Sequence, residues 1–219
     1  MIGNTADKSS VEWAALFAYA AGVTGIIANL FLIILYIQLG LQAGRPEDGT
    51  LLGPVGELAG SANDLLGSLA AAFMIPVALA LARHLPRRPA TRVTQAAGLI
   101  AMALLTVGGP LLVLEVLAFD AATLNAVASY IVLCIWLFLT NRWLRLSDAL
   151  GLRVTRFGEF AGAGYLVGFL IVGLGLLLPW MSWPQLVVFG VGLVIVLPAW
   201  LGIPVWFVLL GRHLGASAG

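Results

Sequence analysis

A single glutamate interrupts one of the most apolar stretches of the chain, GGPLLVLEVLAFD, which runs from Gly108 to Asp120. A carboxylate in such a setting can exchange a proton with a substrate, or it can bind the polar group of a ligand. Its charge costs about 2.5–3.5 kcal/mol in the middle of a membrane and less near the interface. Glu115 is therefore predicted to be either an interface residue or a functional carboxylate.

Polar side chains from other apolar segments are expected at a similar depth, namely Asn29, Tyr36, Asp64 and Asn125. Asn29 lies several turns inside an apolar segment, so it either hydrogen-bonds a neighbouring helix or lines a cavity. Asp64 ends the sequence SAND, which matches a capping box with Ser61 as the N-cap, and capping is favoured over chemistry there. Asn125 either starts a helix or faces the same cavity.

These residues form the candidate site. The candidate catalytic residues are Glu115 and Asp64. The candidate ligand-binding residues are Asn29, Tyr36, Asp64, Glu115 and Asn125.

Several other classes of chemistry are not expected. The sequence contains no HExxH motif and no GxxxxGK phosphate-binding loop. Cys134 is the only cysteine, and His84 and His213 are the only histidines, so no internal disulfide, metal site or cofactor is predicted. The net charge is +1, and no basic stripe carries interleaved aromatic residues, so nucleic acid is not an expected partner.

The elements that must position the candidate site are membrane helices. Hydrophobic residues make up 61% of the chain and charged residues only 10%, whereas a soluble domain has about 25% charged residues. A helix needs about 20 apolar residues to cross a bilayer. Six segments qualify: 13–39, 64–83, 94–118, 123–140, 157–178 and 185–210. The prediction is an all-α integral membrane protein in a bacterial cytoplasmic membrane.

The predicted architecture is a single six-helix transmembrane domain over 13–211, with tails at 1–12 and 212–219 and an outer loop at 40–63. Its orientation follows from the basic residues, because cytoplasmic connections are rich in Lys and Arg. With the N-terminus in the cytoplasm, ten of the 11 basic residues lie inside and only Arg45 lies outside. Both termini are therefore predicted to be cytoplasmic.

Small and polar residues indicate how the helices pack, since close backbone approach and hydrogen bonds hold membrane helices together. On the first segment, one face carries Ala18, Gly22, Gly25, Asn29 and Tyr36, and it is predicted to point into the bundle. On the fifth segment, two pairs of glycines four residues apart predict the closest packing. Arg156 and Glu159, three residues apart on that segment, are expected to pair.

Two pairs of stretches carry a resemblance. NDLLGSLAAAF leads into ALALARHLPRR, and the basic NRWLRLSDALG turns into the Gly-rich FGEFAGAGYLVGFLI. In these features the chain resembles the bacterial multi-pass membrane family catalogued as domain of unknown function 4386. The resemblance covers about residues 10–212 and rests mainly on hydropathy and loop style. It implies a multi-pass membrane protein and carries over no activity.

Three functions fit these observations. The favoured one is a bundle that binds or moves a small amphipathic molecule or lipid in an outward-facing cavity within the membrane. The second is an intramembrane enzyme that uses carboxylates for acid–base chemistry on an apolar substrate. The third is an accessory subunit of a membrane complex. Membrane lipid and a small apolar ligand are the expected partners, and no protein partner is indicated.

Overall fold

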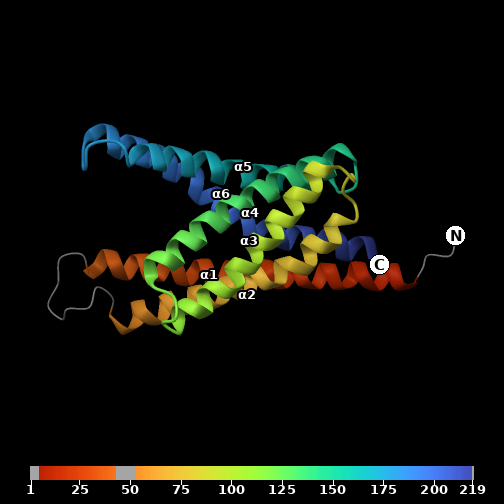
Figure 1. The fold of residues 1–219 in the computed structure, drawn as a ribbon, viewed down its shortest axis with the longest axis horizontal. Helices are drawn as coiled ribbons and strands as arrows, with labels where there is room; N and C mark the ends of the chain where they lie inside the picture. The colour runs from red at the N-terminus through yellow and green to blue at the C-terminus, as the bar shows by residue number, and fades with distance from the viewer. Residues whose placement is uncertain (1–4, 43–52, 219) are drawn as a thin grey trace.

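The computed structural model describes residues 5–42 and 53–218, and the regular structure in these ranges is entirely helical (Figure 1). The helices are α1 (Thr5–Gln42), α2 (Pro54–Ala82), α3 (Pro89–Val113), α4 (Phe119–Leu146), α5 (Leu152–Gly175) and α6 (Trp183–Ala218). All 6 contain segments long and apolar enough to cross a membrane. The predicted all-helical fold with six membrane-length helices is confirmed for the described part of the chain.

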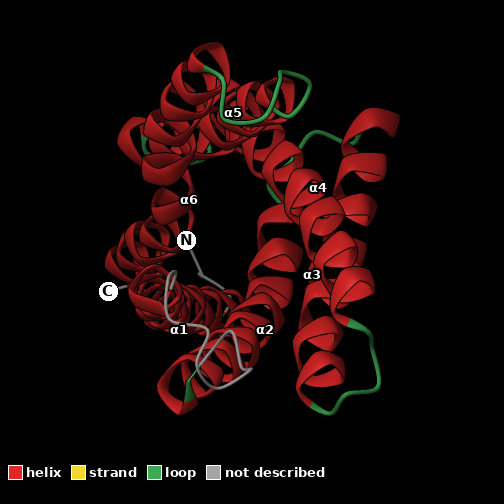
Figure 2. Ribbon diagram, turned by 90° about the vertical axis from the view of Figure 1, so that its left-hand side faces the viewer, coloured by secondary structure: helices red, strands yellow, loops and turns green. Residues whose placement is uncertain are grey.

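The helices form a closed ring. Each helix contacts the helix before it and the helix after it, and α6 closes the ring against α1 (Figure 2). Within the described ranges, no other pair of helices brings its backbones close together. Five of the six contacts thus join consecutive helices, and only the contact between α1 and α6 joins segments far apart in the sequence.

The two ends of the ring differ in charge. The start of α1, the end of α6 and the α2–α3 and α4–α5 connections lie at one end, here called the basic end (Figure 1). It carries Arg83, Arg87, Arg88, Arg92, Arg142, Arg145, Arg153, Arg156 and Arg212. The opposite end, here called the acidic end, comprises the described residues 30–42, 53–66, 110–123 and 175–190. These ranges contain four carboxylates and no Lys, Arg or His.

Helix α2 begins ten residues earlier than the segment predicted from hydropathy. Pro54 occupies its first turn after Gly53, and Glu57 lies in the same turn, where its charge favours the positive end of the helix. Residues 54–63 of the predicted outer loop are therefore helical. The predicted capping box is wrong, because Ser61 and Asp64 lie inside the helix rather than at its start.

Helix α3 ends five residues earlier than predicted. The backbone N–H of Val116 donates to the Leu111 carbonyl and that of Glu115 to the Leu112 carbonyl, both at 2.9 Å. These two hydrogen bonds form a Schellman motif, which ends a helix with one residue in the left-handed conformation. That residue is Glu115, with φ of 57°. It lies beyond α3 and not on it.

The predicted tails also differ from the structure. Helix α1 begins at Thr5 and α6 continues to Ala218, so both helices extend beyond their apolar segments. Residues 1–4 and 219 of the predicted tails and residues 43–52 of the predicted outer loop lie outside the described residues.

The glycines of α5 allow the close packing that their spacing predicts. A Cβ on Gly162 would lie 2.7 Å from the carbonyl oxygen of Cys134 on α4. One on Gly168 would lie 2.6 Å from the backbone nitrogen of Val196 on α6. Because no side chain other than hydrogen fits at such distances, α5 packs directly against the backbones of both neighbours.

The predicted inward face of α1 is largely confirmed. Ala18, Gly22 and Asn29 are buried, and Gly25 packs against the ring of Pro204 on α6. Tyr36 is the exception, because 65% of its surface is exposed.

Two fully buried tryptophans fill the ring on the side of the basic end. The indole N–H of Trp136 donates to the side chain of Gln95 at 3.1 Å, and Gln95 in turn donates to Thr140 at 3.2 Å. The indole N–H of Trp206 donates to Asn141 at 3.1 Å, and the two indole rings meet edge to face. Every polar group of these indoles is therefore satisfied inside the bundle.

Glu159 forms an ion pair with a residue other than the one predicted. Its carboxylate lies 2.8 Å from the guanidinium of Arg145, so it links α5 to α4 instead of pairing with Arg156 on its own helix. The ion pair therefore joins two neighbouring helices at the basic end.

Candidate functional site

A cavity of about 180 Å³ lies inside the ring, between the buried tryptophans and the acidic end. Helices α1, α2, α3, α4 and α6 line it. The lining residues are Gly25, Ala28, Asn29, Leu32, Asn63, Asp64, Gly67, Ser68, Ala70, Ala71, Met74, Leu105, Gly109, Ala126, Tyr130, Leu133, Trp200, Ile203 and Pro204. Most of these side chains are apolar, and the few polar ones come mainly from α2.

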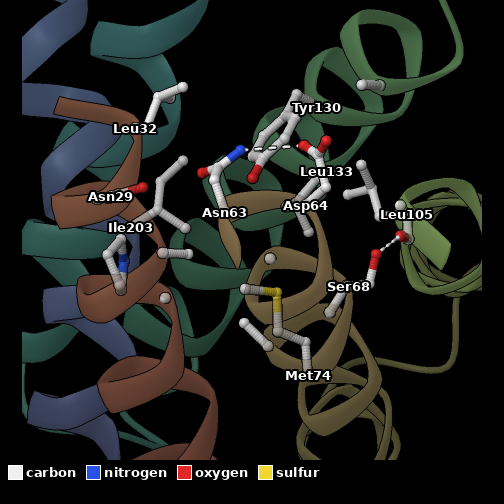
Figure 3. A pocket seen from close by; sticks show the side chains of 18 of the residues that line it. Asn29, Leu32, Asn63, Asp64, Ser68, Met74, Leu105, Tyr130, Leu133 and Ile203 are labelled. Carbon is white, nitrogen blue, oxygen red and sulfur yellow. Dashed lines mark hydrogen bonds between the residues drawn. The ribbon is translucent and has the colours of Figure 1, made fainter. Parts of the chain in front are cut away.

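The polar wall of the cavity is centred on Asp64. The side-chain amide of Asn63 donates a hydrogen bond of 3.1 Å to the Asp64 carboxylate (Figure 3). The Tyr130 ring, from α4, points into the same space. Asp64 is partly buried, because ten residues of α2 separate it from the start of that helix at the acidic end.

Asn29 lies on the α1 wall, across the cavity from this pair (Figure 3). Only 9% of Asn29 is exposed, and its side chain makes no hydrogen bond to another described residue. A buried amide without a partner costs free energy unless water or a ligand satisfies it. Asn29 therefore supplies an unused donor and acceptor to the cavity.

The wall of the cavity formed by α3 is held in place by a hydrogen bond from α2. The hydroxyl of Ser68 donates to the Leu105 carbonyl of α3 at 2.9 Å. At Gly109, one turn further along α3, a Cβ would collide with the Asp64 carbonyl and the Ser68 hydroxyl. The missing side chain lets α3 approach α2 directly behind the carboxylate, which fixes the position of that wall.

Three of the five candidate ligand-binding residues do not line the cavity. Glu115 is exposed in the α3–α4 connection, and Tyr36 is exposed near the end of α1. Asn125 donates a 3.3 Å hydrogen bond to the Leu104 carbonyl of α3 and so joins two helices. The structure thus brings Asn29 and Asp64 together and leaves the other three outside.

The cavity contains residues that the sequence analysis did not select, among them Asn63, Gly67, Ser68 and Tyr130. Asp64, Gly67, Ser68 and Ala71 lie at helical spacing on one face of α2, and this pattern was a usable signal. It was missed because Asp64 was interpreted as a capping residue at the start of the helix, so the residues that follow it on the same face were not read as the wall of a cavity. Tyr130 had no comparable signal.

The chemistry available in the cavity follows from this residue set. Asp64 is the only carboxylate that lines it, and no Lys, Arg or His does so among the described residues. A pair of carboxylates, as acid–base catalysis by Glu115 and Asp64 together requires, is not assembled there. One carboxylate, two amides and two hydroxyl groups in an apolar chamber are typical of a binding site for an amphipathic molecule.

Comparisons with known proteins add no family to this description. No protein-family model matches the chain, and no curated protein or solved structure matches it. The resemblance to the family of domain of unknown function 4386 remains a prediction, and the function is inferred from the geometry.

Proposed function

We propose that this protein is a multi-pass protein of the bacterial cytoplasmic membrane that binds or moves a small amphipathic molecule or lipid in the cavity near its acidic end. The observation that carries the proposal is that the partly buried Asp64 and the buried Asn29 face one apolar chamber. Ionisable residues inside a membrane span are costly and are usually found at ligand or ion pathways. Asp64 fits this description.

The orientation of the ring decides where the ligand enters. The basic end carries nine described arginines, and the positive-inside rule puts such an end in the cytoplasm. The acidic end, and with it the half of the protein that contains the cavity, then faces outward. The buried Trp136 and Trp206 separate the cavity from the cytoplasm.

Native mass spectrometry of the gently purified protein tests the binding proposal. Gly67 lines the cavity, and a Cβ built on it meets no atom within 4 Å. Gly67→Leu therefore places a bulky side chain in the chamber, at a position where the Cβ itself meets no neighbour. Gly190→Leu is the matched control, because Gly190 has equally open space but faces away from the cavity.

The expected result is a bound small molecule on the native protein and on Gly190→Leu, and its loss from Gly67→Leu. A bound mass that survives in Gly67→Leu, or no bound mass on any of the three proteins, contradicts the proposal. Reporter fusions at the C-terminus test the orientation, since a reporter active only in the cytoplasm is expected to be active there.

A further inference from the structure

The negative charge of Asp64 in the cavity indicates which chemical class of ligand the cavity binds. We infer that the occupant is a small organic monocation, a protonated amine with a compact apolar body, whose ammonium group binds Asp64. This inference rests on the proposed function, because it names the chemical class of the ligand in the same cavity.

Asp64 forms no ion pair with any residue that the structure describes. Its one hydrogen bond to another described side chain comes from the neutral amide of Asn63, whereas an ionised carboxylate offers about four lone-pair sites. Among the described residues, no cationic side chain lines the cavity. A carboxylate removed from water is stabilised by an opposite charge held close to it, and an ammonium group of the ligand supplies that charge.

The other polar groups of the cavity can accept hydrogen bonds from the ammonium group of such a ligand. An ammonium group carries three N–H donors and no acceptor. The Asn29 carbonyl oxygen accepts no hydrogen bond from another described residue, and the Ser68 hydroxyl donates its hydrogen to Leu105 and so keeps its lone pairs. The face of the Tyr130 ring attracts cations as well.

The surroundings of the cavity favour the same charge. Three exposed carboxylates, Glu57, Glu115 and Asp120, lie at the acidic end, where the described residues include no basic side chain. Clustered charges of one sign raise the local concentration of ions of opposite sign. An anion approaching the cavity meets repulsion both at this end and at Asp64.

The volume of the cavity limits the body of the ligand. A chamber of about 180 Å³ is close in size to an engineered apolar cavity of about 150 Å³ that holds benzene. The walls formed by Leu32, Met74, Leu133 and Ile203 are apolar. A single small ring with one ammonium group therefore matches both the space and the chemistry.

Three ligands of one shape and different charge test the inference: benzylammonium, benzyl alcohol and benzoate. Their binding is measured by calorimetry at pH 7 on the full chain in nanodiscs of uncharged phosphatidylcholine, with protein-free nanodiscs subtracted. Benzylammonium is expected to bind about ten- to a hundredfold tighter than benzyl alcohol, which corresponds to hydrogen bonds to a charged group. Benzoate is expected not to bind.

Asp64→Asn removes the charge and keeps the shape of the side chain, so benzylammonium affinity should fall to that of benzyl alcohol. Glu115→Gln makes the same chemical change outside the cavity and should keep the tenfold preference. Equal binding of the amine and the alcohol to the native protein, or a preference that persists in Asp64→Asn, overturns the inference. The comparison on the native protein decides the matter even if Asp64→Asn does not fold.

The same data separate this inference from the proposed function. If benzyl alcohol binds as well as the amine and Gly67→Leu abolishes both, the cavity binds ligands and only the cationic class is wrong. If none of the three ligands binds and Gly67→Leu leaves the co-purified mass unchanged, both statements fail.

Discussion

The indole nitrogen of Trp206 lies 3.1 Å from the side-chain oxygen of Asn141, and this hydrogen bond joins α6 to α4, two helices that are not neighbours in the ring. Helix α5 lies between them, and a Cβ on its Gly158 would collide with both side chains. The glycine therefore opens the gap through which the bond passes. Together with the edge-to-face contact between Trp136 and Trp206, this hydrogen bond joins α4 and α6 although their backbones do not pack against each other.

Trp206→Phe should lower the free energy of unfolding by about 1–3 kcal/mol, because it leaves the buried Asn141 oxygen and the Val154 carbonyl without their donor. Trp183→Phe is the matched control, since Trp183 is 80% exposed and should change stability little. Unfolding in detergent micelles measures both. Equal losses in the two variants would show that the hydrogen bonds contribute nothing.

Glu115→Gly should stabilise the protein by about 1 kcal/mol. The left-handed conformation that ends α3 costs a residue with a side chain about 1–2 kcal/mol, and glycine adopts it freely. Glu115→Ala removes the carboxylate but keeps the Cβ, so it should not stabilise. If alanine raises the melting temperature as much as glycine does, the gain comes from the lost charge and the conformational explanation is wrong.

Gly162→Ala should destabilise the protein by about 1–3 kcal/mol, because the new methyl group overpacks the contact with the Cys134 carbonyl. Gly173→Ala on the same helix meets no atom within 4 Å and should be neutral or stabilising by up to about 1 kcal/mol. Thermal unfolding of the two variants in one detergent provides the comparison. A similar response of both positions would argue against tight packing between α4 and α5.

A double-mutant cycle on Arg145 and Glu159 should give a coupling free energy of about 0.5–1 kcal/mol, since the pair is only partly buried. The same cycle on Arg156 and Glu159 should give a value near zero. A larger coupling for Arg156 would restore the pairing expected within α5 and contradict the ion pair between helices.

The number and order of the helices could be predicted because apolar length is a local property of the sequence. The packing faces of α1 and α5 were also predictable, since glycine at helical spacing has few purposes other than close approach. Helix ends were less predictable. Asp64 looked like a cap because SAND matches a capping box, yet Gly53–Pro54 starts the same helix ten residues earlier.

Sequence patterns could not predict which side chains of different helices pair with each other. The choice of Arg145 over Arg156 as partner of Glu159 depends on how α4 and α5 are rotated against each other. Glu115 was placed on α3 because its surroundings are apolar, but a backbone hydrogen-bond pattern ended the helix before it. Hydropathy indicates how long an apolar segment is, but it does not indicate the residue at which the helix ends.

The contact between α1 and α6 has a consequence for how the protein is made. Trp200, Ile203 and Pro204 of the last helix complete the wall that Gly25 and Asn29 of the first helix begin. Without α6, the cavity that contains Asp64 and Asn29 would lack the wall formed by these three residues. The cavity is therefore complete only once the last helix of the chain has been made and packs against the first.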